Sequence, residues 1–330
     1  ASKGGAVSTL VEHLIEDNSV SKQANLTVVS YFDQKAEELS KKYKNVEFVW
    51  VRIPLFIKVL DGVGYWLVKK LFPKKKAVSF KSLFSLLWYI RFGIRFLKEN
   101  QFDKLVLENN IPMAMMIKRS HYQGEYYYHF HNVPRISAHC QDVFQKCNGY
   151  LCVSQYVANQ ITGDNSVIGK IPKEKVHVLY NCINTKLFHP ITDFEKLEQY
   201  REKYGLSKED KVVIFVGRLS EEKGVDIVIR AVTELPGVKL LIVGSYMHNS
   251  KGSDAYQDML YELTKRIKDQ VIFTGYVDQA NMPILYSIAD VAALPSMWEE
   301  PAGLTMIEAI ACGIPVITTQ SGGIPEYVGD

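Results

Sequence analysis

Two glutamates, Glu300 and Glu308, stand eight positions apart in the run EPAGLTMIE and could bind a polar ligand together. The preceding run VAALPS is typical of a buried strand, and LTMIEAIAC has the spacing of a helix. Pro301 therefore lies in the turn before that helix, and free amides at a helix start attract an anion. A carboxylate would repel a phosphate there, so we expect each glutamate to accept a hydrogen bond from a sugar hydroxyl. The amides that would hold the phosphate belong to Gly303, Leu304 and Thr305.

A second group of charged residues follows the strand-like run VVIFVG, which ends at Gly217. Arg218 and Lys223 occupy the loop between that run and the next helical segment. Ligands of open α/β sheets bind beyond the carboxyl ends of the strands, which is where both cations would lie. A guanidinium offers a fixed fork of donors and an ammonium offers a mobile charge, so the pair suits a diphosphate.

Each of these two signals also has a purely structural explanation. Glu300 could cap the helix while Glu308 is a solvated helix residue. Arg218 and Lys223 could lie in a solvated turn whose charge the neighbouring glutamates balance. The spacing alone leaves both explanations open.

The first half of the chain carries weaker signals of the same kind. Gly4 and Gly5 precede an apolar helix and could form the facing half of a phosphate site, although glycine pairs are mostly turns. The run YYYHFHN places His129 and His131 on one face of a strand, with His131 at its end. A strand histidine is more often a satisfied polar group than a ligand, so its position favours a functional role only modestly.

Short apolar runs alternate with longer segments of helical period along the chain. Runs rich in Val and Ile are typical of parallel strands covered on both faces, and their alternation with helices predicts two doubly wound α/β domains. A polar, helix-prone stretch at 189–211 separates two series of runs, so we place the domains at 1–190 and 191–330. The chain opens on a glycine loop with no strand before it, so we expect incomplete termini. The expected strands are 26–32, 46–51, 104–109, 126–132, 150–154, 176–181, 212–217, 239–244, 271–275, 291–296 and 315–319.

The composition is that of an ordinary soluble or peripheral protein. The 330 residues are 47% hydrophobic and 23% charged, which is enough apolar material for two cores. No secretory signal opens the chain, and no apolar run approaches the roughly 20 residues of a membrane span. The five cysteines are odd in number and lack metal-ligand spacing, which favours buried thiols in a reducing compartment.

The charge is unevenly distributed. Residues 52–98 contain eleven Lys and Arg against a single acid, Asp61, so this segment has a charge of +10. The whole chain has a net charge of only +3. Such asymmetry indicates a local anionic partner. We expect 80–98 to be an amphipathic core helix, with Leu87 among its core-facing residues. The stretch 55–76 mixes apolar and basic residues and suits an anionic lipid surface, whereas a nucleic-acid surface is disfavoured because no such module is recognisable.

Taken together, these motifs resemble the retaining GT-B glycosyltransferases of family GT4, which build bacterial glycolipids and polysaccharides. EPAGLTMIE is similar to the family's Glu-x7-Glu motif, and VGRLSEEKGVD to its G-R-x5-K-G loop. IADVAALPS and SGGIPEYV match two further segments of the family. LYNCINTKLFHP is similar to the family's interdomain hinge, although Tyr180, Cys182 and Asn184 stand where the family has proline, glycine and aspartate. The resemblance is dense over 176–330 and thinner over 1–175.

The resemblance implies a fold of two Rossmann-like domains with the active site in the cleft between them. Arg218 and Lys223 would hold the donor diphosphate, while Glu308 would bind the ribose hydroxyls. Glu300 and the amides of Ala302 to Thr305 would position the transferred sugar. The remaining residues implied are Gly4 and Gly5 near the phosphates, Gly217 in the donor loop, His131 at the sugar, and Tyr276 and Val277 at the base.

The chemistry implied is metal-independent transfer with retention of configuration. No Asp-x-Asp pair stands at a strand end, so we expect no magnesium and no cofactor, and Arg218 and Lys223 would neutralise the leaving diphosphate instead. The acceptor hydroxyl would attack the face that the diphosphate leaves and pass its proton to the departing phosphate. The protein would contribute mainly orientation and electrostatics.

The leading hypothesis is therefore an enzyme that moves a hexose-type sugar from a nucleotide donor to a glycan or lipid-linked acceptor, in the cytoplasm or at the inner face of the membrane. Uridine diphosphate is preferred on family frequency alone. A sugar-nucleotide epimerase or phosphorylase and a non-catalytic donor-binding subunit remain as alternatives. A dinucleotide oxidoreductase is disfavoured because no Gly-x-Gly-x-x-Gly follows a strand.

Overall fold

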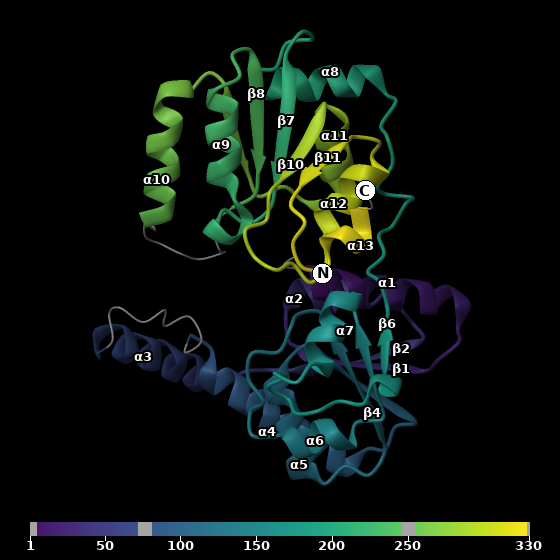
Figure 1. Ribbon diagram of the computed structural model, residues 1–330. Helices are drawn as coiled ribbons and strands as arrows, with labels where there is room; N and C mark the ends of the chain where they lie inside the picture. The colour runs from purple at the N-terminus through teal and green to yellow at the C-terminus, as the bar shows by residue number, and fades with distance from the viewer. Residues whose placement is uncertain (1–4, 72–80, 246–254, 329–330) are drawn as a thin grey trace. The chain divides into compact units, whose positions relative to one another are not determined.

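The computed structural model of the protein describes residues 5–71, 81–245 and 255–328 (Figure 1). The chain divides into two compact units, Ala1–Val153 with Ala158–Leu179, and Ser154–Val157 with Tyr180–Asp330. Each expected strand run contains a strand, and all paired strands are parallel, which confirms the α/β class. The expected domain boundary near residue 190 stays a prediction.

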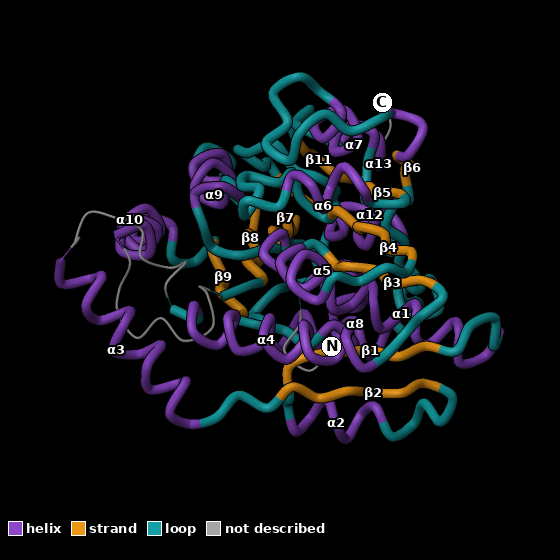
Figure 2. The backbone as a smooth tube through the Cα atoms, turned by 90° about the horizontal axis from the view of Figure 1, so that it is seen from below, coloured by secondary structure: helices purple, strands orange, loops and turns teal. Residues whose placement is uncertain are grey.

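The first unit contains two parallel ladders. Figure 2 shows β1 and β2 running side by side, with Leu26 opposite Val46. The other four strands follow the order β3-β4-β5-β6. The strands are β1 (Leu26–Tyr31), β2 (Val46–Val51), β3 (Lys104–Glu108), β4 (Glu125–Phe130), β5 (Gly149–Cys152) and β6 (Val176–Val178). The helices of this half are α1 (Ala6–Ser21), α2 (Gln34–Ser40), α3 (Leu55–Leu71), α4 (Leu83–Glu99), α5 (Ala114–Ser120), α6 (Gln141–Lys146) and α7 (Gln155–Thr162), with single 3₁₀ turns at η2 (Ile111–Met113) and η3 (Lys173–Lys175).

The second unit is one five-stranded parallel sheet in the order β11-β10-β7-β8-β9. Its strands are β7 (Lys211–Val216), β8 (Val238–Val243), β9 (Val271–Gly275), β10 (Val291–Leu294) and β11 (Val316–Thr318). Its helices are α8 (Phe194–Lys203), α9 (Val225–Thr233), α10 (Ala255–Thr264), α11 (Met282–Ser287), α12 (Leu304–Ala311) and α13 (Ile324–Val328), with 3₁₀ turns η4 (Glu221–Lys223), η5 (Lys265–Ile267) and η6 (Gln279–Asn281).

Both faces of this sheet are buried. Successive strand residues point to opposite faces, so Ile214 of β7 packs into a core with α11 and α12, while its neighbour Phe215 packs into a core with α9 and α10. Figure 1 shows these helix pairs covering the two faces. The arrangement explains why the strands of this unit read as unbroken apolar runs.

Helix α4 begins at Leu83 because a side chain from another helix caps it. Asp61 of α3 is buried and accepts hydrogen bonds from the backbone N–H of Phe84 (2.7 Å) and from the backbone and hydroxyl of Ser85 (3.2 and 2.5 Å). A carboxylate satisfies free amides and complements the dipole at a helix start. The single acid of the basic stretch thus joins α3 to α4.

The core face of α4 differs from the expected one at Leu87. The buried residues of α4 are Tyr89, Ile90, Gly93 and Leu97, and the hydroxyl of Tyr89 donates to the carbonyl of Val29 in β1 (2.9 Å). Leu87 lies at the border of this buried face of α4, and 46% of the residue is exposed. The expectation that Leu87 faces the core was therefore wrong.

The cysteines behave largely as expected. Cys140, Cys147, Cys152 and Cys312 are buried free thiols, whereas Cys182 is exposed. Among the described helices, none is long and apolar enough to cross a membrane.

Candidate active site

The order of the strands in the second unit locates a ligand site. From β7 the chain continues through α9 to β8 on one side, while β10 pairs with β7 on the other side. Connections thus leave in opposite directions at the β7–β10 junction, and open sheets bind ligands beyond the strand ends at such a point. Gly217 follows β7 there, and Pro295 follows β10. Pro295 also terminates β10, because proline has no N–H to donate to the next strand.

The two loops beyond these strands are joined backbone to backbone. The N–H of Met297 donates to the carbonyl of Glu222 (2.8 Å). Gly224 has a φ of 66°, and a Cβ atom on it would lie 2.2 Å from the carbonyl oxygen of Pro295. Only glycine fits this close approach, so the loop bearing Lys223 is held against the loop bearing Glu300.

Glu300 and Lys223 form an ion pair at this junction. The Nζ of Lys223 contacts Oε1 of Glu300, and the hydroxyl of Ser296 donates to the same oxygen (2.8 Å). The side chain of Glu300 is buried, while a quarter of the Lys223 side chain remains exposed, with its Nζ 5.8 Å from the centre of the Trp298 ring. In the described residues the Glu300 carboxylate bonds to these groups and not to the start of α12. The helix-capping explanation of Glu300 is thereby disfavoured.

The backbone of Glu300 is fixed by the segment after β11. The N–H of Gly323 donates to the Glu300 carbonyl (2.7 Å), and the N–H of Gly322 donates to a carboxylate oxygen of Glu299 (2.6 Å). Helix α12 then begins at Leu304 with Gly303 as its cap residue, which supplies no side-chain acceptor. Within the described residues, the N–H groups of Leu304 and Thr305 at the helix start have no recorded hydrogen-bond acceptor.

Glu308 lies one turn into α12, and the pKa of its carboxyl group is raised. The hydroxyl of Tyr286 lies 3.1 Å from Oε2 of Glu308 and 3.2 Å from the carbonyl of Thr305. Burial raises the pKa of Glu308 to about 7, against hydrogen bonds from Tyr286 and Gln279 that lower it. Glu308 is therefore not the fully solvated residue of the structural alternative.

The other predicted donor residues lie around this centre with more exposure. Arg218 is solvent-exposed and lies 3.6 Å from a carboxylate oxygen of Glu222. Tyr276 follows β9 and is 55% exposed, whereas Val277 packs partly buried against the core. These three residues lie in loops after β7 and β9, at the same edge of the sheet as Glu300.

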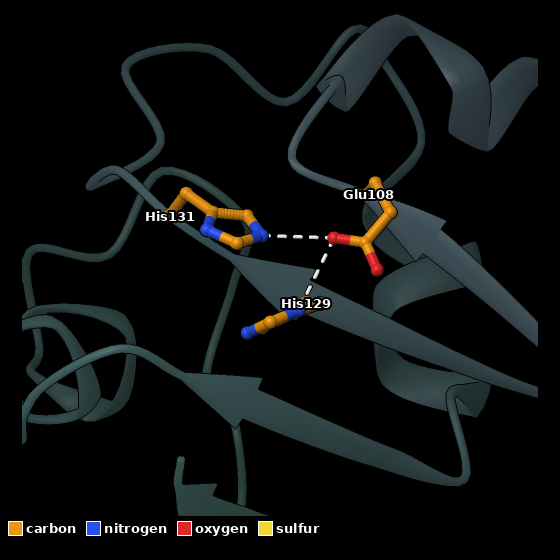
Figure 3. A group of neighbouring side chains, drawn as sticks. All are labelled: Glu108, His129 and His131. Carbon is orange, nitrogen blue, oxygen red and sulfur yellow. Dashed lines mark hydrogen bonds and ion pairs between the residues drawn. The ribbon is translucent and has the colours of Figure 1, made fainter. Parts of the chain in front are cut away.

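In the first unit, the predicted residue His131 belongs to a polar cluster (Figure 3). Nε2 of His131 lies 2.8 Å, and Nδ1 of His129 3.1 Å, from the same oxygen, Oε2 of Glu108. Burial raises the pKa of Glu108, but hydrogen bonds from both rings outweigh burial and lower it to about 2. Gly5 is the cap residue of α1 with a φ of 107°, and Gly4 lies outside the described residues.

Sequence reasoning did not single out Glu108, Ser296 or Tyr286. Glu108 ends a strand directly opposite His129, so its place at a strand end was an available signal. Ser296 is also a polar residue just after a strand. Tyr286 carried no signal, because it looks like one more apolar residue of α11.

Comparison with solved structures defines the class of fold. A crystal structure of an Anabaena protein, HepE, in complex with UDP and glucose superimposes with a TM-score of 0.70 at 19% identity, covering 98% of this chain and 79% of that one. The structure of a glycosyltransferase from Rickettsia africae gives a TM-score of 0.71 at 20% identity, covering 100% and 79%. The chain has the GT-B fold, which consists of two Rossmann-like domains.

Comparison of sequences then identifies the second half. Residues 197–330 match the family described as glycosyl transferases group 1. An uncharacterized glycosyltransferase of Methanocaldococcus jannaschii is 36% identical over 160 residues, which are 48% of this chain and 39% of that protein. Spore coat protein SA of Bacillus subtilis is 28% identical over 245 residues, which are 70% and 63%. The matches thus span less than two thirds of these relatives' lengths.

Proposed function

We propose that the protein is a retaining glycosyltransferase that moves a hexose-type sugar from a nucleotide donor to a glycan or lipid-linked acceptor in cell-surface polysaccharide synthesis. The observation that carries this proposal is the meeting of Lys223, Glu300 and the start of α12 beyond β7 and β10. A UDP-sugar is the preferred donor, since the structurally similar Anabaena protein was solved with UDP and glucose.

Within the second unit, each group has a distinct task. Arg218 and Lys223 bind the diphosphate as fixed cations, together with the amides of Gly303 and Leu304. Glu308 binds the ribose hydroxyls, and Glu300 accepts a hydrogen bond from the transferred sugar. Because Lys223 already contacts Glu300, donor binding draws the ammonium partly toward phosphate and frees an acceptor oxygen for the sugar. Tyr276 and Val277 flank the base, and Ala302 and Thr305 complete the turn.

The transfer itself needs mainly charge stabilisation. The bond from the sugar C1 to the β-phosphate oxygen breaks, and a bond from C1 to the acceptor oxygen forms on the same face. The acceptor proton passes to the leaving phosphate, whose negative charge Lys223 and Arg218 stabilise. No metal is required for this step. His131, Gly4 and Gly5 are proposed donor-side residues on the strength of the family resemblance.

A screen of nucleotide sugars tests the proposal. The purified protein should slowly hydrolyse one UDP-hexose and release UDP, and Lys223→Met should lower the rate by about 100-fold or more, as removal of a charge-stabilising group does. The matched control is Lys208→Met, which removes an exposed lysine paired with Glu198. Absence of hydrolysis and of UDP binding by calorimetry would refute the transferase. A tightly bound cofactor or phosphate-dependent turnover would instead indicate the epimerase or the phosphorylase.

A second proposal concerns the surface on which the protein works. The face of α3 is apolar and exposed, with Leu55 at 77%, Phe56 at 58% and Trp66 at 57% exposure. Lys70 lies 5.0 Å from the Trp66 ring, beside Lys69 at the end of the helix. Amphipathic helices with flanking lysines bind anionic membranes, so α3 would dock on the inner face of the cell membrane, where a lipid-linked acceptor resides. Residues 72–76 of the predicted stretch lie outside the described residues.

Vesicle sedimentation tests this surface. The protein should bind vesicles containing phosphatidylglycerol, and the double variant Trp66→Ser, Leu67→Ser should bind at least about tenfold more weakly, because burying these side chains supplies part of the binding energy. Leu235→Ser, which changes an exposed leucine of the second unit, is the control. Equal binding by the double variant would remove the membrane role of α3 and leave the transferase proposal intact.

A further inference from the structure

A hollow in the first unit has a strongly positive lining. It lies between α4 and α5, which are neighbours in Figures 1 and 2, and its volume is about 560 Å³. Its charged lining consists of Arg91, Arg95, Lys98 and Arg119 against a single carboxylate, Glu99, so its net charge is +3. A recess lined by charges of one sign concentrates the electrostatic potential and attracts ions of the opposite sign.

Helical spacing brings these cations together. The three cations of α4 are four and three positions apart, so they form a stripe along one face of that helix. Arg119 extends the lining from α5. The two helices approach closely at Gly93, where a Cβ atom would lie only 2.0 Å from Sδ of Met116 in α5. The two walls of the hollow are thus packed directly against each other.

The four cations lack counter-charges of their own. Within the described residues, none of their side chains forms an ion pair or a hydrogen bond, and Glu99 pairs with none of them. By contrast, Lys118, which precedes Arg119 in α5, lies 2.8 Å from a carboxylate oxygen of Asp142. Like charges that share a recess repel one another, and a bound anion would offset that repulsion.

The helix dipole explains only part of this cluster. Lys98 and Arg119 lie in the last turns of α4 and α5, where a cation complements the negative end of a helix. Arg91 and Arg95 lie further from the end of α4, and the effect of the dipole falls off within the last turn. These two arginines therefore need another explanation.

The rest of the lining is apolar. It consists of Leu87, Ile90, Ile94 and Met115. Ile90 is buried, whereas Leu87 is exposed, so a ligand in the hollow would meet hydrocarbon as well as charge. A guanidinium offers a planar fork of donors that matches the oxygens of a phosphate. The lining therefore suits an organic phosphate, whose carbon atoms would cover the apolar side chains.

The hollow lies toward the opposite edge of the sheet from His131. Helix α4 ends at Glu99, shortly before β3 begins at Lys104, and α5 ends at Ser120, shortly before β4 begins at Glu125. The ends of both helices thus lie near the amino ends of the strands, whereas His131 follows the carboxyl end of β4. Ligands of open α/β sheets bind beyond the carboxyl ends, so the hollow is not part of that site.

We propose that the hollow between α4 and α5 binds the phosphate group of an organic phosphate. The four binding residues are Arg91, Arg95, Lys98 and Arg119. A lipid headgroup and a soluble phosphate ester share this chemistry, and the experiment below distinguishes them. The site does not depend on the transferase proposal, and it gives an anionic partner to three of the basic residues of 52–98 that lie outside α3.

NMR of the arginine side chains tests the hollow directly. In ¹⁵N spectra of the wild-type protein at low salt, the Nε–H signals of Arg91, Arg95 and Arg119 are assigned by single substitutions to lysine. These signals should shift, with saturation, when dihexanoyl phosphatidic acid is added. Glycerol 3-phosphate carries a similar phosphate without acyl chains. Equal affinity for the two ligands identifies a soluble phosphate as the partner, and at least about tenfold tighter binding of the dihexanoyl compound identifies a lipid.

A pair of double variants separates a local site from a general effect of charge. Arg95→Gln with Arg119→Gln removes one exposed cation from each helix and should weaken binding at least about tenfold, as measured at Arg91. Arg230→Gln with Arg266→Gln makes the same change of charge at exposed positions of the second unit and should bind as the wild type does.

Two results would overturn the proposal. One is that neither ligand shifts the three Nε–H signals in the wild-type protein, a measurement that depends on no variant for its binding result. The other is that the two double variants weaken binding equally, because the net charge alone would then be responsible. Either result would leave the cations of α4 and α5 as a solvated basic face. The screen for donor hydrolysis is unaffected by both, so the two proposals fail separately.

Discussion

At the scale of single residues, the contact between Lys223 and Glu300 sets the properties of the proposed donor site. The two residues are 77 positions apart, and the carboxylate is buried. Removing either partner leaves the other charge unpaired, so a single substitution changes stability as well as activity. Experiments on this site therefore need both readouts.

A double-mutant cycle separates the two effects. Lys223→Met should lower the free energy of unfolding by about 1–3 kcal/mol, because Glu300 is then buried without its cation. Glu300→Gln should rescue part of this loss in the double variant, as measured by urea unfolding, while activity stays low. Additive effects of the two substitutions would show that the ion pair contributes nothing to stability.

Glu308 gives the site a dependence on pH. Its pKa is about 7 in the folded protein against an ordinary 4.5, so the folded state binds more protons between these values. The free energy of unfolding should therefore fall as pH rises from about 4.5 to about 7, by about 1–3 kcal/mol. Urea unfolding of wild type and of Glu308→Gln over this range measures the difference. Parallel pH profiles for the two proteins would contradict the raised pKa.

At the scale of elements, the loops beyond β7 and β10 depend on a close backbone approach. Gly224→Ala should destabilise by about 2–4 kcal/mol, since it combines a positive φ with a clash against the carbonyl of Pro295. Gly205→Ala is a matched control, because Gly205 has a φ of 65° and open space around it, and it should cost only about 1 kcal/mol. Equal costs in thermal unfolding would mean that the loop moves to accept the methyl group.

The junction of α3 and α4 depends on one buried carboxylate. Asp61→Ala should lower the free energy of unfolding by about 1–3 kcal/mol, because the amides of Phe84 and Ser85 lose their acceptor. Asp61→Asn keeps an acceptor and should lose less. Hydrogen exchange at Phe84 and Ser85 would report the change locally, and unchanged protection in Asp61→Ala would contradict the capping role.

At the scale of the whole molecule, the charge asymmetry predicts that the proposed membrane binding depends on salt. Lys69 and Lys70 flank an exposed apolar face, so attraction to anionic lipid adds to apolar burial. Binding to phosphatidylglycerol vesicles should weaken several-fold between about 50 and 500 mM salt, because salt screens the attraction between the lysines and the anionic lipid. It should not be abolished, because the apolar contact remains. Complete insensitivity to salt would leave apolar contact alone as the driving force.

The sequence by itself determined the elements and the fold class. Strand runs such as 212–217 and 271–275 are recognisable because a parallel strand buried on both faces must be apolar throughout, which is a local property. The start of α12 at Leu304 was equally local, since Gly303 disfavours a helix that begins earlier and includes it. The motifs of the second half also predicted the family that residues 197–330 match, because such motifs are read from local spacing along the chain.

Only the tertiary structure decided which side chains meet. The contacts of Lys223 with Glu300, of Glu108 with two histidines, and of Asp61 with the start of α4 join residues that are distant in sequence. Such contacts depend on strand order and on where a connection leaves a sheet, and neither quantity is written in a local pattern. The pKa of Glu308 has the same origin, because burial by residues from other elements raises it.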